Sequence, residues 1–241
     1  MQIFPDQESL SLAAAALFVQ LARQAVAARG RFSAALCGGR TPSRTYELLA
    51  HLPFRDQVPW DRVHVFWGDE RCVPLDDPRS NFGLAHLAFL NRVPIPPAQV
   101  HPIRCQGSPE EGAHRYEHEL RACFGEAPRF DLIFLGLGEN GHTASLFPHT
   151  AVLKERSRWA RAVFPAGQDL PRVTLTAPVI NRAAVVAFLV TGASKSGVLK
   201  EVLYGPRDHD RLPAQLIRPE RGELLWLADR AAGSEVKEKI G

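Results

Sequence analysis

Short apolar runs alternate along the chain with longer stretches in which apolar residues recur every three or four positions. This alternation predicts strands and helices that follow one another, as in α/β layer folds. The expected helices cover residues 8–29, 42–49, 81–90, 109–123 and 195–203. The expected strands cover residues 32–37, 63–67, 130–135, 159–164, 172–176, 185–190 and 223–227.

These elements predict a Rossmann-like α/β fold, with a mostly parallel sheet flanked by helices on both faces. A chain of 241 residues can build one sizeable core, so we expect residues 1–241 to form a single domain. Residues 205–213 are rich in Pro, Gly and Asp, and we expect a loop there rather than a linker, because little chain follows.

The charge balance is mild, with 29 basic and 26 acidic residues and a net charge of +3. Nucleic-acid binding calls for a clustered basic face, so we expect no nucleic-acid partner. The mild net charge is compatible with a local cationic pocket for an anionic metabolite. We expect no bilayer-spanning stretch and no membrane partner, and the first residues lack a signal-peptide pattern. The expectation is a cytoplasmic protein, as a monomer or weak homodimer.

The four cysteines are widely spaced and form no Cys-x-x-Cys pair. Neither a zinc knuckle nor a redox dithiol is indicated. We expect four free thiols in a reducing cytosol. The residues are Cys37, Cys72, Cys105 and Cys123.

Four expected strands end in loops of unusual composition, at residues 38–41, 68–71, 136–142 and 191–195. In open parallel sheets, ligands bind beyond the carboxyl ends of the strands. We therefore expect these loops to converge on one crevice.

Residues 136–141 match the Gly-x-Gly-x-x-Gly pattern of dinucleotide-binding loops. That fingerprint needs a long following helix and an acid at the tip of the next strand. Here Pro148 is expected to end the helix after about two turns, and no acid follows the next strand, which argues against a nucleotide. His142 lies directly beyond the glycines, beside Ser145, and histidine suits proton transfer near neutral pH.

The loop Gly38-Gly39-Arg40-Thr41 precedes an expected helix for which Thr41 is a plausible N-cap. Glycines let the backbone approach an anion, and the helix N-terminus supplies free N–H groups. A plain strand-to-helix turn would look the same.

The charged residues at other strand ends are open to two interpretations. Arg71 could clamp a phosphate and Asp69 could bind hydroxyls or orient a base, or the two could form a solvated ion pair. Lys195 and Arg172 are each either a surface cation or a phosphate contact. The sequence has neither a Gly-x-Ser-x-Gly elbow nor a His-Glu-x-x-His spacing, so no serine triad or metal site is indicated.

Together these segments resemble the 6-phosphogluconolactonases, in the right order and over nearly the whole chain. The resemblance rests on residues 37–42, 66–74 with Ser80-Asn81, 130–148, 172–181 and 192–195. It implies a fold similar to glucosamine-6-phosphate deaminases and ribose-5-phosphate isomerases. It also implies hydrolysis of 6-phosphoglucono-δ-lactone to 6-phosphogluconate without a metal or organic cofactor, with His142 as general base.

On this interpretation, the catalytic residues are His142, Asn140 and Asp69. The substrate-binding residues are Gly38, Gly39, Arg40, Thr41, Arg71, Gly138, Ser145, Arg172 and Lys195. The sequence does not divide the cations between the phosphate and the carbonyl. The similar family commonly has Asp at position 140. Asn140 can still fix the imidazole tautomer but cannot stabilise an imidazolium by charge, so either Asn140 suffices or Asp69 supplies that charge.

Two alternatives remain. A glucosamine-6-phosphate deaminase would be expected to carry a Glu in the block after His142, and residues 143–148 lack it. A non-catalytic sugar-phosphate sensor would need a DNA-binding segment, for which no part of the chain is spare.

Overall fold

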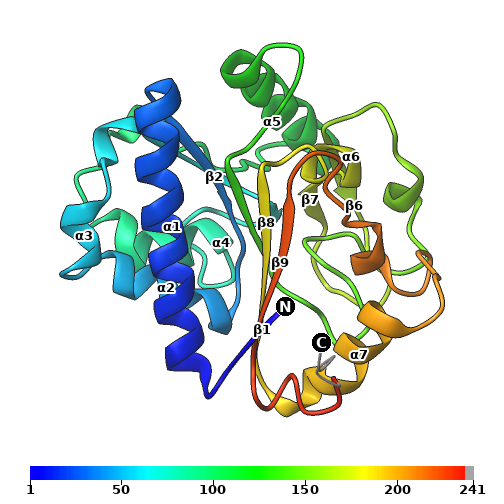
Figure 1. Ribbon diagram of the computed structural model, residues 1–241. Helices are drawn as coiled ribbons and strands as arrows, with labels where there is room; N and C mark the ends of the chain where they lie inside the picture. The colour runs from blue at the N-terminus through cyan, green and yellow to red at the C-terminus, as the bar shows by residue number, and fades with distance from the viewer. Residues whose placement is uncertain (237–241) are drawn as a thin grey trace.

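A computed structural model, which describes residues 1–236, has a six-stranded sheet whose strands all run parallel (Figure 1). The strand order is β1-β9-β8-β5-β2-β3. The bounds are β1 Gln2–Phe4, β2 Phe32–Leu36, β3 Val63–Trp67, β5 Leu132–Leu135, β8 Val185–Val190 and β9 Glu223–Asp229. The predicted α/β fold with a mostly parallel sheet is confirmed, although β1 was not anticipated from its three residues.

A second, three-stranded antiparallel sheet has the order β4-β7-β6. Its strands are β4 Asp69–Arg71, β6 Ala160–Val163 and β7 Arg172–Leu175. Strand β4 follows β3 after a single residue, Gly68, so the chain passes directly from one sheet into the other. Residues Asp69, Glu70 and Arg71, which we expected in a loop, therefore form a strand.

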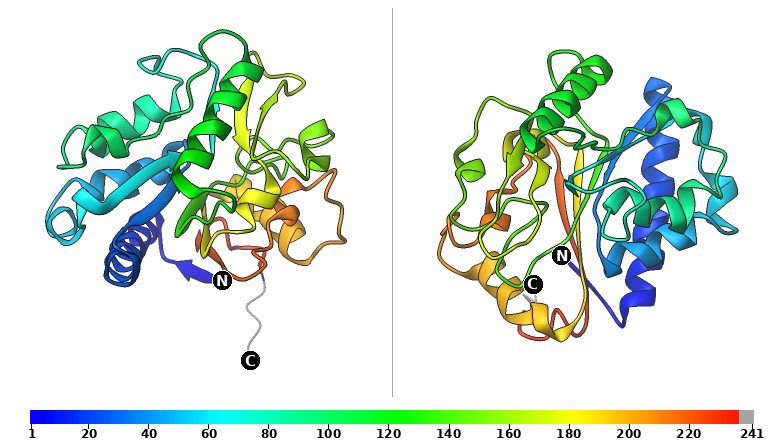
Figure 2. Two further views of the ribbon diagram at one scale, coloured as in Figure 1. Left: turned by 90° about the horizontal axis from the view of Figure 1, so that it is seen from above. Right: turned by 180° about the vertical axis from the view of Figure 1, so that it is seen from behind.

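Helices flank both faces of the large sheet. The helices are α1 Gln7–Arg29, α2 Arg40–Leu49, α3 Phe54–Gln57, α4 Asn81–Ala85, α5 Pro109–Phe124, α6 Ala177–Ile180 and α7 Ser196–Tyr204, with a π-helical turn at His86–Leu90. Single 3₁₀ turns lie at Trp60–Arg62, Pro97–Gln99, Ala151–Lys154, Ala193–Lys195 and Pro213–Leu216. Helices α1 to α4 lie on one side, and α5 to α7 with the small sheet lie on the other (Figures 1 and 2).

Helix α1 corrects one expectation, because its length and apolar composition would allow it to cross a membrane. It is also a core helix, packed against β2, β9 and α2. The Asp6 carboxylate caps its start by accepting a hydrogen bond from the Ser9 N–H at 2.8 Å, and Gly30 ends it with φ 74°. Small residues such as Ala14 and Ala15 are fully buried and let the helix approach the sheet closely.

Two local expectations were wrong. Helix α2 begins at Arg40 with Gly39 as its N-cap, so Thr41 is not the cap; its hydroxyl instead lies 2.7 Å from that of Thr191. No helix follows the glycine segment before Pro148, and residues 136–150 form an irregular loop. Tertiary hydrogen bonds from distant segments, such as the Thr174 hydroxyl contact to the Ser145 N–H, compete there with helix formation.

The expectation of four free thiols was also wrong, because Cys72 and Cys105 form a disulfide. The two residues are 33 positions apart, and their Cα atoms are 5.0 Å apart. The turn from β3 into β4 brings Cys72 to the segment that contains Cys105, which sequence spacing cannot reveal. Cys37 and Cys123 are free.

Two buried tyrosines hold the carboxyl ends of adjacent strands. The Tyr46 hydroxyl accepts a hydrogen bond from the N–H of Cys37 at 3.1 Å and donates to its carbonyl at 2.8 Å, just beyond β2. The Tyr116 hydroxyl bonds in the same way to Trp67, the last residue of β3, at 3.0 and 2.8 Å. These phenols satisfy backbone groups at the points where the two strands open into loops.

We expect Tyr46→Phe and Tyr116→Phe each to lower the free energy of unfolding by about 1–3 kcal/mol, because a buried N–H and carbonyl lose their partner. Urea unfolding measures this change. Tyr204→Phe is the matched control, since Tyr204 is 55% exposed and should unfold like the wild type. Equal stabilities for all three variants would contradict the assigned role.

Candidate active site

The loops after β2, β3, β5 and β8 converge at the carboxyl edge of the large sheet, as predicted. They enclose two adjoining cavities that share Gly38, Gly136, Leu137 and Lys195. The histidine cavity, of about 250 Å³, is lined by His142, Asp69, Arg71, Asn81, Gly138, Ala144 and Arg172, with the shared residues and Cys37. The glycine-loop cavity, of about 480 Å³, is lined chiefly by residues 38–42, 189–195 and Glu139.

His142 is half-buried against Phe147, with the ring centroids 4.3 Å apart. Its Nδ1 lies 2.5 Å from the Asn140 Oδ1. Since an amide oxygen only accepts, Nδ1 carries the proton and Nε2 keeps a free lone pair.

Burial lowers the pKa of His142 to about 4, against an ordinary value of 6.5. The cations Arg172, Lys195 and Arg71 also lower this pKa, whereas the Asp69 carboxylate raises it. His142 is therefore neutral at physiological pH, which is the state that a general base requires.

The backbone around His142 leaves no room for other side chains. A Cβ at Gly138 would overlap the imidazole, and Gly141 has φ 80°. Ala144 adopts φ 47°, a left-handed conformation that is costly for a residue with a Cβ and that is concentrated at functional sites.

Asp69 is held from two sides. The Ser145 hydroxyl donates to its Oδ2 at 2.6 Å, and the Asn81 Nδ2 donates to its backbone carbonyl at 2.8 Å. Ser145 is fully buried and lines neither cavity, so its position fits orientation of Asp69 rather than direct contact with a ligand.

Arg71 and Arg172 lie directly opposite each other in the β4–β7 pair. Like charges in this position repel, and burial lowers the pKa of Arg172. Within residues 1–236, the buried Nε atoms of both side chains lack a hydrogen-bond partner. Because both side chains line the histidine cavity, this pair of cations suits an oxyanion.

Sequence reasoning did not select Glu70, although it stands between two chosen residues. Its buried carboxylate accepts four hydrogen bonds from β4 and the start of α4. The donors are the N–H groups of Arg71, Asn81 and Phe82 at 2.7 Å each and the hydroxyl of Ser80 at 2.9 Å. Burial raises the pKa of Glu70, but these donors oppose that shift and fix the turn behind Arg71.

Asn81 is a second missed residue, and its amide lies where a Cβ at Gly38 would be. Gly38 therefore serves close packing against Asn81. The Ser80-Asn81 pair is one of the segments that resemble the 6-phosphogluconolactonases, and it could have indicated Asn81. The sequence could not show that the Asn81 amide reaches Asp69.

The glycine-loop cavity contains the N-terminus of α2, where Gly39 supplies no side-chain cap. Its N–H groups and dipole favour an anion. Arg40 and Thr41 line this cavity, and Lys195 lies at its boundary with the histidine cavity, 3.6 Å from Glu139. Except for the buried Ser145, every residue predicted from the strand-end loops lies in or beside one of the two cavities.

Comparisons with known proteins show the family and the fold. Residues 5–226 match the model of a family described as glucosamine-6-phosphate isomerases/6-phosphogluconolactonase. A Synechocystis 6-phosphogluconolactonase is 48% identical over 219 residues, covering 89% of this chain and 88% of the relative.

Two solved structures are similar over nearly their whole length. The 6-phosphogluconolactonase of Trypanosoma cruzi has a TM-score of 0.86 at 28% identity, covering 98% of this chain and 96% of that one. A monomeric glucosamine-6-phosphate deaminase has a TM-score of 0.82 at 23% identity, covering 98% of this chain and 100% of that one, and shares the fold.

We expect the imidazole of His142 to stay neutral down to about pH 4, because burial and three cations disfavour its charged form. An NMR titration of its Cε1–H resonance measures this pKa. In Asn140→Asp, a carboxylate beside Nδ1 should raise the pKa toward 6.5. A wild-type midpoint at the ordinary value, unchanged in the variant, would contradict the described surroundings of the ring.

Proposed function

Because this chain belongs to the glucosamine-6-phosphate isomerase and 6-phosphogluconolactonase family, we propose that it hydrolyses 6-phospho-D-glucono-1,5-lactone to 6-phosphogluconate. The observation that carries the proposal is a neutral histidine whose Nδ1 is held by Asn140, at a cavity lined by Asp69 and two arginines. This set of groups suits proton transfer beside a developing negative charge.

A lactone carbonyl is electrophilic enough to be attacked by water, so no covalent nucleophile is needed. In the proposed mechanism, the Nε2 of His142 takes a proton as a water oxygen bonds to C1 of the lactone. The tetrahedral intermediate then collapses and the bond from C1 to the ring oxygen breaks. The imidazolium returns its proton to the departing ring oxygen, which becomes the C5 hydroxyl of the product.

The oxyanion of the intermediate is assigned to Arg71 and Arg172. Their side chains line the histidine cavity, and as cross-strand partners they bring two positive charges to it. A site formed before the substrate arrives stabilises developing charge without reorganisation at the moment of reaction. The mutual repulsion of the two cations would be relieved as the oxyanion forms.

The phosphate is assigned to the adjoining glycine-loop cavity. C1 and the C6 phosphate lie at opposite ends of the sugar, and the two cavities share a wall. The α2 N-terminus with Gly39, Arg40 and Thr41 would receive the phosphate, and Lys195 at the boundary would pair with it. This assignment gives Arg71 and Arg172 to the carbonyl and Lys195 to the phosphate, a division that the sequence alone did not provide.

Asp69 is assigned to stabilise the imidazolium. Asn140 is neutral and fixes only the tautomer, whereas the Asp69 charge favours protonated His142. Ser145 and Asn81 hold Asp69 in place for this purpose.

The proposal includes a single catalytic domain that requires no cofactor and works in the cytoplasm as a monomer or weak homodimer. Glucosamine-6-phosphate deamination is the alternative within the same fold, and the lack of a Glu in residues 143–148 argues against it. A sugar-phosphate sensor would bind the lactone without turnover.

We expect the purified protein to accelerate the disappearance of 6-phosphogluconolactone above its spontaneous rate and to release no ammonia from glucosamine 6-phosphate. His142→Gln should lower kcat by roughly a hundredfold or more, because the general base is lost. His118→Gln, on the exposed face of α5, is the matched control and should retain activity. Binding without turnover would identify a sensor, and unchanged turnover in His142→Gln would remove the base assignment.

We expect Lys195→Gln to raise KM by roughly tenfold to a hundredfold with little effect on kcat, as for a lost charge-assisted contact made throughout the reaction. Arg172→Gln should instead lower kcat by roughly a hundredfold, since its assigned contact strengthens in the transition state. Lys200→Gln, on the exposed side of α7, is the control. Steady-state kinetics with the phosphorylated lactone measure both effects. The opposite pattern would reverse the two assignments.

A further inference from the structure

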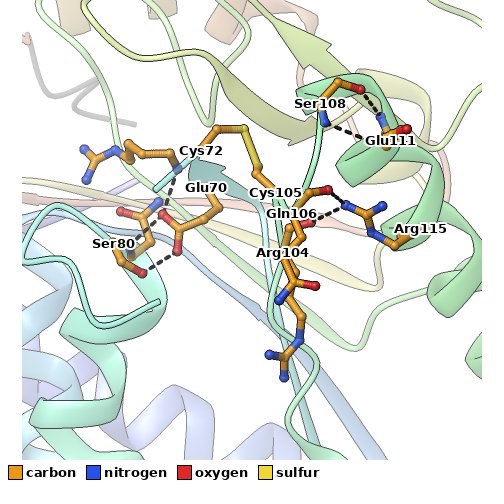
Figure 3. Close-up of a disulfide and its surroundings, with 11 residues drawn as sticks. Glu70, Cys72, Ser80, Arg104, Cys105, Gln106, Ser108, Glu111 and Arg115 are labelled. Carbon is orange, nitrogen blue, oxygen red and sulfur yellow. Dashed lines mark hydrogen bonds between the residues drawn. A yellow bond between two sulfur atoms is a disulfide. The ribbon is translucent and has the colours of Figure 1, made fainter. Parts of the chain in front are cut away.

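The Cys72–Cys105 disulfide joins the end of β4 to the coil that precedes α5 (Figure 3). Cys72 is the residue after Arg71 at the end of β4, and its N–H donates to the Pro171 carbonyl at 2.9 Å, next to Arg172. Both cysteines are partly exposed and lie outside the fully buried core. Both cysteine residues therefore keep some solvent exposure, and the backbone of Cys72 adjoins the positions of both arginines.

The other end of the disulfide is anchored to the start of α5. A capping box between Ser108 and Glu111 fixes that start, with hydrogen bonds of 2.9 and 3.2 Å. The Arg115 side chain donates to the Gln106 carbonyl, and Gly112 leaves room for Cys105 to pack against the helix. These contacts hold the coil that contains Cys105 against the start of α5 (Figure 3).

Cys72 is the first residue of a loop, residues 72–79, whose last residue contacts the Arg71 side chain. Glu70 fixes the residues at both sides of this loop by its bonds to Arg71, Ser80 and Asn81. Within it, the Arg79 carbonyl accepts a hydrogen bond from the Arg71 Nη1 at 2.7 Å. The disulfide is the covalent restraint on this loop, so its state is coupled to the position of the Arg71 guanidinium.

We propose that this disulfide is a redox-sensitive tether that holds Arg71 in its working position and that a dithiol reductant releases. The inference rests on the proposed lactonase function and adds a regulatory site to it. A thiolate of the reductant attacks one sulfur of the disulfide, and its second thiol resolves the mixed disulfide. Two electrons and two protons pass to Cys72 and Cys105, and the reductant leaves as its own disulfide.

The other two cysteines are unsuited to this chemistry. Burial raises the pKa of the Cys37 thiol to about 12, so it forms almost no thiolate. Burial also raises the pKa of Cys123, which lies near the end of α5. Cys123 therefore provides a matched control that removes a thiol without touching the tether.

The test compares the full-length protein after incubation in oxidised and reduced dithiothreitol. Mass measurement of alkylated protein should show two fewer reactive thiols in the oxidised form, mapped to Cys72 and Cys105. Reduction should lower kcat/KM for 6-phosphogluconolactone by roughly tenfold, because Arg71 is less well positioned. Cys72→Ser and Cys105→Ser should show the reduced value under both conditions, and Cys123→Ser should respond as the wild type does.

A second readout does not depend on activity. Amide hydrogen exchange within residues 71–79 should become faster on reduction, and in both serine variants without reduction. Equal exchange and equal kcat/KM in the two states would overturn the tether, as would failure of the two thiols to pair. Absence of lactonase activity in both states would instead refute the proposed function, while faster exchange on reduction would still support the tether.

Discussion

One buried carboxylate organises much of this active site. Glu70 accepts hydrogen bonds from Arg71, Ser80, Asn81 and Phe82, and thereby joins β4 to the start of α4. Asn81 then holds Asp69, which accepts in turn from Ser145 in the loop after β5. A single chain of polar contacts thus links the small sheet, a helix and the loop of His142. A buried network of this kind gives rigidity that isolated pairs do not, and among the described residues only the Asn81 Oδ1 and the Arg71 Nε in it lack a partner.

The electrostatics of the site follow from this rigidity. Burial, assisted by three cations, lowers the pKa of the imidazole more than the Asp69 carboxylate raises it, so His142 stays neutral. Arg71 and Arg172 repel each other and would move apart if they were free, but they are fixed as cross-strand partners. The fold therefore stores an unbalanced positive charge where the proposed reaction generates a negative one.

Apolar periodicity was enough to place most of the large sheet, because its strands are continuous buried runs such as β8. The convergence of the strand-end loops also followed, since carboxyl ends of parallel strands share one edge. The sequence did not reveal what depends on contacts between distant segments. The turn of the chain into a second sheet gives rise to several such features. They are strand β4, the four hydrogen bonds of Glu70, the contact of Asn81 with Asp69 and the Cys72–Cys105 disulfide. Thr41 as an N-cap failed because Gly39 has the conformation that starts α2.

The loop of residues 136–150 has almost no regular structure of its own, and distant parts of the chain fix its shape. Ser145 is bonded to Asp69 and Thr174, the Gly141 carbonyl accepts from the Ala214 N–H, and the His149 N–H donates to the Asp210 carbonyl. The native contacts of this loop therefore require the chain as far as residue 214. A truncation before residue 214 would remove partners of the proposed active-site loop even though most strands of the large sheet lie earlier in the chain.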